Sequence, residues 1–243
     1  MKTMTLVAYN RPHYLAEMLE SLRANDCSGY HLFIGIEPGC PEVVGICKAI
    51  DFMPKTVVVN DRVLGINNNN FNIIQTAIDA GSEFNVYLED DIIISKDTIA
   101  MANWYSTLPQ RNDYLGLIFR KEKGDKQSPF IVEPTKKFHP WGFCFTRYNW
   151  NLWFKKVWRM PKEHTKITWD WPLMLIAKNQ ERLYYLQPSM GRSRTIGREG
   201  GTCCTAAYFD RAYASDELYE GPPGEFEFRP LVQGPPDLVE AQG

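Results

Sequence analysis

Short apolar runs alternate with stretches of helical periodicity over the first 95 residues of the chain. Four of these runs are bounded by turn residues and predict strands at residues 3–9, 31–37, 56–60 and 84–88. Between them, apolar residues recur at helical spacing, as Leu15, Met18 and Leu22 do after Pro12. Such alternation is typical of the α/β class. We therefore expect a Rossmann-like, mostly parallel central sheet with helices on both faces.

A run of four asparagines at residues 67–70 interrupts this pattern. Helices are expected over residues 42–51, about 71–80 and about 97–108. Four residues are too few for a low-complexity segment, and Asn is favoured at the N-cap of a helix. We interpret the run as the cap of the helix at residues 71–80.

The pattern changes after residue 110. Strands are expected at residues 114–119, 130–132 and 183–187, and helices at residues 147–158 and 169–178. From residue 220 onward, Gly-Pro and Pro-Pro breaks predict an extended tail.

Aromatic residues gather in this second half, where six of the seven tryptophans lie between residues 141 and 171. Core packing is the ordinary explanation for such density, and stacking on a sugar ring is the sharper one. Trp141 is the best candidate for stacking, because Pro140 and Gly142 place it on a turn.

Three consecutive acids, Glu89, Asp90 and Asp91, follow the predicted strand at residues 84–88. A solvated turn is the simplest interpretation of acids at the end of a strand. In open α/β sheets, however, ligands bind at the carboxyl ends of the strands. Adjacent carboxylates at such a point suit Mg²⁺ or Mn²⁺ holding a diphosphate, because these ions prefer oxygen ligands.

A basic, glycine-rich segment at residues 192–202 has almost no apolar content. This composition suits a mobile lid over phosphates, and a solvated loop is the competing interpretation.

Charge and composition narrow the classes of function. The 27 Lys and Arg residues against 29 Asp and Glu residues give a net charge of -2, so no bulk positive field recruits nucleic acid or an anionic membrane. No apolar stretch approaches the roughly 20 residues of a membrane span, and Met1-Lys2 leads into a strand rather than a signal peptide. We therefore expect a cytoplasmic protein without a membrane span.

The six cysteines form no Cys-x-x-Cys pair and the four histidines are dispersed, which argues against a zinc site. We interpret most of the cysteines as small core residues. Disulfides are the alternative if the protein is secreted.

The order of these motifs resembles the N-acetylglucosaminyltransferase I family of GT-A glycosyltransferases over roughly residues 4–210. The motifs that carry the resemblance are Arg11-Pro12, Glu89-Asp90-Asp91, the turn at residues 140–143, Trp169-Asp170-Trp171, and Ser193-Arg194-Thr195 followed by residues 197–200. The resemblance implies a GT-A fold and an inverting transfer of a sugar, GlcNAc or another hexose, from a UDP-sugar to an acceptor hydroxyl. It also implies a divalent cation, Mn²⁺ or Mg²⁺, on the donor diphosphate.

The resemblance assigns roles to single residues. Asp91 corresponds to the direct metal ligand, and Glu89 and Asp90 to residues that contact the ribose and the donor sugar. The general base of the family lies in a Trp-Asp-Asp-Trp segment, and Asp170 is its candidate here, one acid short of that pattern. A helix N-cap is the alternative role for Asp170.

Further residues follow from the same resemblance. Arg11 and Glu37 correspond to positions near the uracil, with surface ion pairs or turns as alternatives. Arg194 and Arg198 are candidates to approach phosphate as planar donors. Three residues are candidates for acceptor or sugar contact: Trp141, Gly142 and Trp169. The expected organisation is a nucleotide-sugar-binding half at 1–110, an acceptor-binding and catalytic half of the same domain at 111–219, and an extended tail at 220–243.

Two other functions stay open. A nucleotidyltransferase that makes nucleotide sugars would carry a glycine-rich, lysine-containing phosphate loop near the N-terminus, and Asn10-Arg11-Pro12 is not one. A sugar-binding protein of the same fold without catalysis is the third interpretation.

Overall fold

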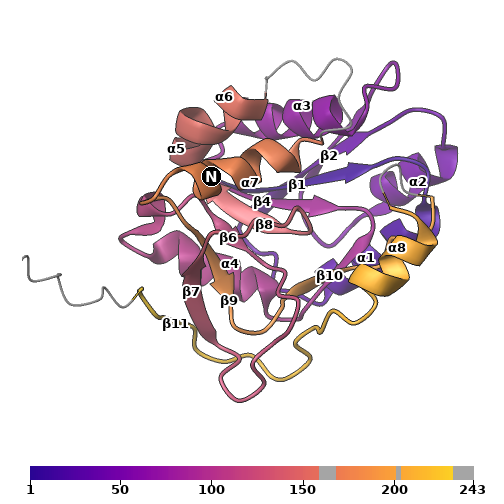
Figure 1. The fold of residues 1–243 in the computed structure, drawn as a ribbon. Helices are drawn as coiled ribbons and strands as arrows, with labels where there is room; N and C mark the ends of the chain where they lie inside the picture. Colours follow the sequence, from indigo (N-terminus) through magenta and orange to yellow (C-terminus); the bar gives the residue numbers. More distant parts are fainter. Residues whose placement is uncertain (159–167, 201–203, 232–243) are drawn as a thin grey trace, which may run out of the picture.

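The structure is a computed structural model that describes residues 1–158, 168–200 and 204–231. Most of its strands form one sheet, which runs through the middle of the molecule (Figure 1). The strands are β1 (Lys2–Ala8), β2 (Tyr30–Ile36), β3 (Lys55–Val59), β4 (Phe84–Glu89), β5 (Ile92–Ile94), β6 (Leu117–Ile118), β7 (Ile131–Thr135), β8 (Phe143–Thr146), β9 (Tyr185–Pro188), β10 (Ser193–Thr195) and β11 (Glu227–Phe228).

Within the described ranges, nine strands form the central sheet in the order β11-β7-β9-β6-β8-β4-β1-β2-β3. The four strands from β4 to β3 are parallel, and β8 pairs antiparallel with β4. A separate antiparallel pair joins β5 to β10. The parallel sheet predicted for the first half is confirmed, with Leu6 of β1 opposite Ile34 of β2 and Leu88 of β4.

Helices cover both faces of the central sheet. They are α1 (Pro12–Arg23), α2 (Pro41–Ala49), α3 (Ile66–Asp79), α4 (Thr98–Thr107), η1 (Arg111–Asp113), α5 (Arg147–Asn149), η2 (Trp150–Phe154), α6 (Lys155–Trp158), α7 (Asp170–Asn179) and α8 (Ala206–Ala212). The core on one face contains residues of α1, α2 and α4, and the core on the other contains residues of α3, η2, α6 and α7. In Figure 1, α3, α5 and α6 lie together along one side of the sheet.

The strand that ends in the acids is buried on both faces. Val86 and Leu88 of β4 face one core, and Tyr87 faces the other. Asn85, a polar residue with no exposed surface, donates to Thr5 Oγ1 at 2.9 Å and accepts from Thr3 Oγ1 at 2.8 Å. These bonds satisfy the amide inside the protein, since an unpaired buried amide would destabilise the fold.

The asparagine run is part of a helix, so its interpretation as a cap is wrong. The helix α3 begins at Ile66 rather than near residue 71, and the position before its first turn is Gly65, whose φ of 76° favours glycine. Asn69 and Asn70 are buried because they have partners far away in the sequence. Such partners cannot be read from local propensity.

Two other elements differ from the prediction. The helix expected at residues 147–158 consists of α5, a π-helical turn (η2) and α6. The segment at residues 192–202 begins inside the protein rather than as a loop, because Ser193–Thr195 forms β10 and Arg192 has no exposed surface. The guanidinium of Arg192 pairs with Asp97 and lies 4.1 Å from the ring centroid of Tyr219.

The expected tail begins with a strand at the edge of the sheet, since β11 pairs in parallel with β7. The rest of the tail, residues 232–243, lies outside the described residues, as does the end of the predicted lid at residues 201–203. Cys27, Cys47 and Cys144 are buried free thiols, which agrees with their interpretation as core residues. Among the described residues, no helix is long and apolar enough to cross a membrane.

Candidate active site

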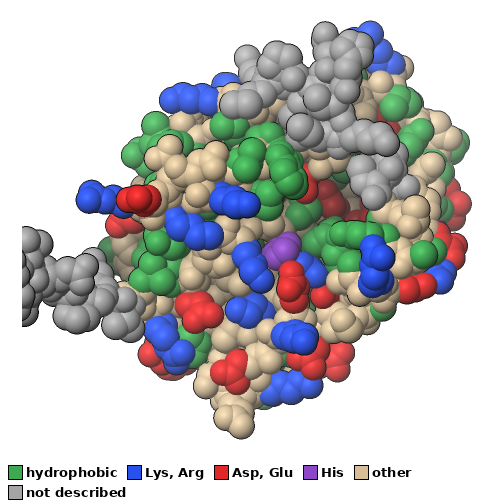
Figure 2. All heavy atoms as spheres, in the orientation of Figure 1, with side chains coloured by type: hydrophobic (Ala, Val, Ile, Leu, Met, Phe, Trp, Pro, Cys, Tyr) green, Lys and Arg blue, Asp and Glu red, His purple; other side chains and the backbone are tan. Residues whose placement is uncertain are grey.

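A cleft of about 380 Å³ opens at the carboxyl ends of β1, β2 and β4. Its wall includes residues from both halves of the chain, among them Arg11, Glu37, Asp91, Trp141 and Asp170. Figure 2 shows this face hollowed beside the residues drawn in grey, with acidic side chains inside the hollow. The cleft lies where open α/β sheets bind their ligands.

The acidic motif is held at the floor of the cleft by one arginine. Arg11 Nη2 donates to Asp90 Oδ1 at 2.6 Å, and Nη1 donates to Asp91 Oδ2 at 2.7 Å. The other oxygen of Asp90 accepts from the backbone N–H of Tyr9 at 3.2 Å. The solvated turn is therefore excluded for this motif, because Glu89 and Asp90 are buried.

Burial changes the acidity of the first two acids. Desolvation raises the pKa of Asp90 to about 6, although the neighbouring Arg11 guanidinium opposes this shift. Desolvation also raises the pKa of Glu89 well above its ordinary value, and the nearby charge of Asp91 adds to the effect. Glu89 Oε1 accepts a hydrogen bond from the Tyr87 hydroxyl at 2.8 Å.

Asp91 has the features expected of a metal ligand. Its Oδ1 is buried and has no hydrogen-bond partner among the described residues. Gly197 lies against the same carboxylate, so that a Cβ there would overlap Oδ2. Since the described residues hold no group of three or more His, Cys, Asp or Glu arranged for a metal, an ion here would need further ligands from a bound substrate.

Glu37 lies at the end of β2 and lines the same cleft. Its carboxylate accepts from the Leu64 backbone N–H at 3.2 and 3.0 Å and from Asn60 Nδ2 at 3.3 Å. The side chain is buried and fixed from the direction of β3, rather than paired with a surface cation.

Asp170 is the first residue of α7, and the N-cap position belongs to Trp169. The carboxylate accepts a hydrogen bond from the Thr168 hydroxyl and lines the cleft. Its charge contributes to the raised pKa of Glu89, and both acids line the same cleft.

The three aromatic-turn candidates differ in their exposure. Trp141 lines the cleft and is half-buried, with its ring centroid 4.6 Å from that of Tyr213. Gly142 has φ of 83°, and a Cβ there would lie 2.9 Å from Phe119 Cδ2. Trp169 is only 1% exposed and its ring stacks on Trp158 with centroids 4.6 Å apart, so most of its surface contributes to the core.

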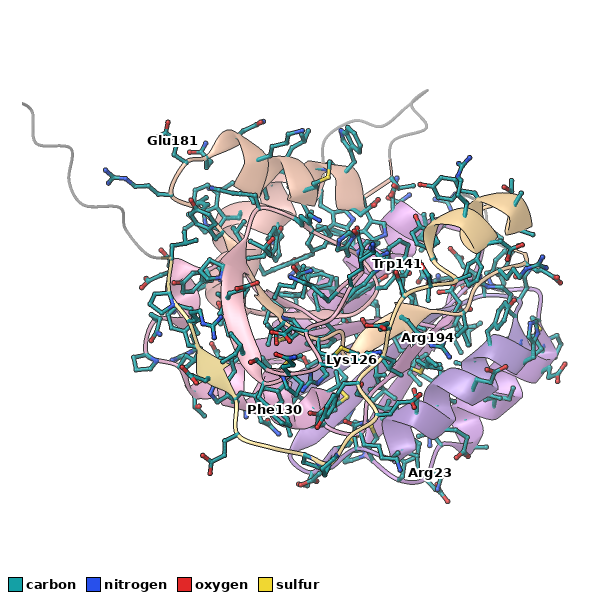
Figure 3. All side chains as sticks on the ribbon, turned by 60° about the horizontal axis from the view of Figure 1, so that its bottom comes forward. Arg23, Lys126, Phe130, Trp141, Glu181 and Arg194 are labelled. Atoms are coloured by element: carbon teal, nitrogen blue, oxygen red, sulfur yellow. The ribbon has the colours of Figure 1, made fainter. Side chains whose placement is uncertain are left out.

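The two arginines of the predicted lid, Arg194 and Arg198, lie in different environments. Arg198 is exposed and pairs with Asp210 at 2.8 Å and with Glu199 at 3.1 Å, and it is not among the residues that line the cleft. Arg194 lies on β10, as Figure 3 shows, and is not among the residues that line the cleft either. Its Nε is buried without a partner among the described residues.

Two polar residues on the floor of the cleft, Asn69 and Asn70, are not among the site residues predicted from the sequence. The asparagine run marks these positions in the sequence, but which of its side chains face the sheet follows only from the start of α3 at Ile66.

No protein-family model matches the chain, and a search of curated proteins finds no match. Solved structures do match. TarS of S. aureus, residues 1–349 in complex with UDP-GlcNAc, superposes with a TM-score of 0.58 at 18% identity, over 84% of this chain and 60% of TarS 1–349. The same TarS fragment alone gives 0.56 at 17% identity, over 76% and 57%. The mannosyltransferase PcManGT from Pyrobaculum calidifontis, in complex with GDP-Man and Mn²⁺, gives 0.53 at 16% identity, over 77% and 54%.

The chain has the GT-A fold. At identities of 16–18%, these superpositions show a shared fold only. The reaction has to be inferred from the residues of the site. The chain spans 54–60% of the length of these three structures. The cleft of this fold is lined by the acid motif at the end of β4, by Glu37 at the end of β2 and by Asp170 at the start of α7.

Proposed function

We propose that the protein is a metal-dependent, inverting glycosyltransferase that moves a sugar, GlcNAc or another hexose, from a UDP-sugar to an acceptor hydroxyl. The observation that carries this proposal is Asp91, whose Oδ1 is buried and unpartnered among the described residues at the floor of a GT-A cleft. A relation to the N-acetylglucosaminyltransferase I family is part of the proposal, based on the motifs rather than on the fold.

The donor is held from two sides in this proposal. Glu37, at the end of β2, contacts the uracil of the donor. Glu89 and Asp90, at the end of β4, contact the ribose and the donor sugar. TarS was solved with UDP-GlcNAc, which supports a UDP-sugar as the donor class. Arg194 is the better candidate of the two arginines for phosphate, since Arg198 is already paired with Asp210 and Glu199.

Asp91 would hold a divalent cation through Oδ1, with Mn²⁺ or Mg²⁺ as candidates. PcManGT, solved with GDP-Man and Mn²⁺, supports a metal in this fold. The cation supplies neutralisation of the charge that builds on the departing diphosphate. On the protein side, Asp91 keeps an oxygen available while Arg11 holds its other oxygen in place.

Asp170 would take the proton of the acceptor hydroxyl as that oxygen attacks the anomeric carbon. Attack from the face opposite the diphosphate inverts the anomeric centre, so the base must lie across the cleft from the metal ligand. The hydrogen bond from Thr168 fixes one carboxylate oxygen and leaves the other for the proton. Trp141, with one part of its ring exposed on the cleft wall, would contact the acceptor or the sugar.

The test is a screen of UDP-sugars for Mn²⁺-dependent release of UDP by the wild-type protein and by Asp91→Asn. We expect the wild type to release UDP only with the metal, and Asp91→Asn to lose the activity. Asp51→Asn is the matched control, because Asp51 forms an exposed pair with Arg23 away from the cleft. Full activity of Asp91→Asn, or of the wild type with a chelator, contradicts the metal role. Binding of UDP without turnover across donors and acceptors contradicts the transferase.

A further inference from the structure

Two adjacent asparagines of α3, Asn69 and Asn70, reach two different parts of the cleft. Both side chains are buried, at 4% and 0% exposure, and both line the cleft floor. A buried amide is costly unless its hydrogen bonds are made, so its partners indicate what it holds in place.

Asn69 connects to the carboxylate of Glu37. Its Nδ2 donates to the carbonyl of Gly35 at 3.1 Å, and its Oδ1 accepts from Asn60 Nδ2 at 3.0 Å. Asn60 Nδ2 also donates to Glu37 Oε2 at 3.3 Å. One amide therefore ties the end of β2 to the residue that follows β3, and it fixes the acid on the uracil side.

Gly35 permits this arrangement. A Cβ at position 35 would lie 2.7 Å from Asn69 Oδ1 and 3.1 Å from Ile73 Cβ. The absence of a side chain on β2 lets the helix bring the amide close enough to the sheet to bond the backbone.

Asn70 connects β4 to α7. The orientation of its amide follows from its partners, because two donors face one end and a carbonyl faces the other. Oδ1 accepts from Trp169 Nε1 at 2.8 Å, and Nδ2 donates to the carbonyl of Ile66 at 3.1 Å. The Tyr87 hydroxyl lies 2.7 Å from Oδ1, and its single proton serves either this oxygen or Glu89 Oε1.

Two partners of Asn70 adjoin residues of the proposed reaction. The Tyr87 hydroxyl is 2.8 Å from Glu89 Oε1, and Trp169 immediately precedes Asp170. The amide thus bridges the strand that carries the donor-side acids and the helix that begins with the candidate base.

We propose that Asn69 and Asn70 are positioning residues with separate tasks: Asn69 sets Glu37 for binding the nucleoside, and Asn70 sets Asp170 relative to Glu89 for the transfer step. This inference rests on the proposed function. It differs from a merely structural role, which would lower the fraction of folded enzyme, and with it the apparent kcat, in both variants while leaving KM unchanged. For this reason kcat is expressed per UDP-binding site counted by calorimetry.

The experiment compares Asn69→Leu, Asn70→Leu and Asn68→Leu by steady-state kinetics and by calorimetry of UDP with Mn²⁺. Leu keeps the same branching at Cγ without hydrogen-bonding groups. Asn68 is the matched control from the same run, since its exposed side chain bonds the carbonyl of Leu64, just before the helix. We expect Asn69→Leu to raise the donor KM and the Kd of UDP about tenfold with kcat within about twofold, and Asn70→Leu to lower kcat about 10- to 100-fold with KM within about twofold.

Two milder variants keep the proposal testable if a buried Leu prevents folding. Asn60→Leu breaks the link between Asn69 and Glu37 at a half-buried site, and should reproduce the KM effect. Trp169→Phe keeps an aromatic ring but removes the donor to Asn70, and should reproduce the kcat effect.

The outcomes separate this proposal from the function on which it rests. Wild-type enzyme without UDP-sugar turnover contradicts the function, and with it the positioning roles. An active wild type with equal effects of Asn69→Leu and Asn70→Leu on both constants, or with an effect of Asn68→Leu, overturns the positioning roles alone.

Discussion

Gly197 lies directly against the carboxylate of Asp91, with the position of a missing Cβ only 2.8 Å from Asp91 Cγ. A side chain at residue 197 would force that carboxylate to rotate away from Arg11 or push the segment after β10 out of place. The backbone beyond β10 therefore forms one wall of the proposed metal site.

Gly197→Ala should reduce the affinity for Mn²⁺ in the presence of UDP by about tenfold or more, because the methyl group displaces the liganding carboxylate. Calorimetry measures this directly. Gly45→Ala is the control, since Gly45 lies in α2 with open space at its Cβ. Equal affinity of Gly197→Ala and wild type would contradict the placement of the metal ligand.

Arg11→Gln should lower the free energy of unfolding at neutral pH by about 2–3 kcal/mol, because it leaves two largely buried carboxylates without their counter-charge. The Arg11 side chain is 17% exposed and those of Asp90 and Asp91 are 5% and 13% exposed. Urea denaturation of the wild type and of Arg11→Gln measures this difference in the free energy of unfolding. Mn²⁺ with UDP should restore part of it, and an unchanged midpoint would show that the pair contributes little.

Arg192→Met should destabilise the protein by about 3–5 kcal/mol, because Asp97 would remain as a buried, unpaired charge. Arg192 and Asp97 are 0% and 1% exposed. Adding Asp97→Asn to this variant should recover part of the loss. Arg23→Met is the control, as its exposed pair with Asp51 should contribute less than about 1 kcal/mol. Chemical denaturation of the three variants distinguishes a structural ion pair from a surface one.

His139 should make the fold less stable as the pH falls below 6.5. Burial, followed by the charges of Arg120 and Lys137, lowers its pKa to about 3, whereas an unfolded histidine titrates near 6.5. Between these values the unfolded chain binds more protons, so the stability present above pH 6.5 declines toward pH 3. Among the described residues, Glu122 at 3.8 Å is the acidic neighbour that would favour protonation.

The measurement is the free energy of unfolding at pH 7 and pH 5 for wild type and His139→Gln. We expect the wild type to lose about 2 kcal/mol more than the variant over this range, because Gln cannot bind the proton. The difference between the two proteins removes the contribution of the other titrating groups. Parallel pH curves would contradict the assignment.

The sequence predicts the first half of the fold well, because β1, β2, β3 and β4 are apolar runs that end at turn residues. It also identifies the acid motif, whose position after β4 follows from chain order alone. The same reasoning overestimates β6, where two residues of the strand expected at 114–119 pair in the sheet, and it misses β11, which forms only through pairing with the distant β7.

The sequence also fails to predict which polar residues are buried. Arg192 and Arg120 look like residues of solvated loops, yet Asp97 and Asp216 pair with them inside the protein from 95 and 96 positions away. Asn70 is likewise buried because of Tyr87 and Trp169. Local patterns assign charge and amide groups to the surface, and only the tertiary structure shows which of them have partners.

The close approach of Gly35 and Asn69 has a consequence for evolution. Any side chain at position 35 would collide with the amide at position 69, and a smaller residue at 69 would leave the Gly35 carbonyl without its donor. Homologues should therefore change these two positions together, and an alignment of close relatives should show them as a covarying pair although they are 34 residues apart.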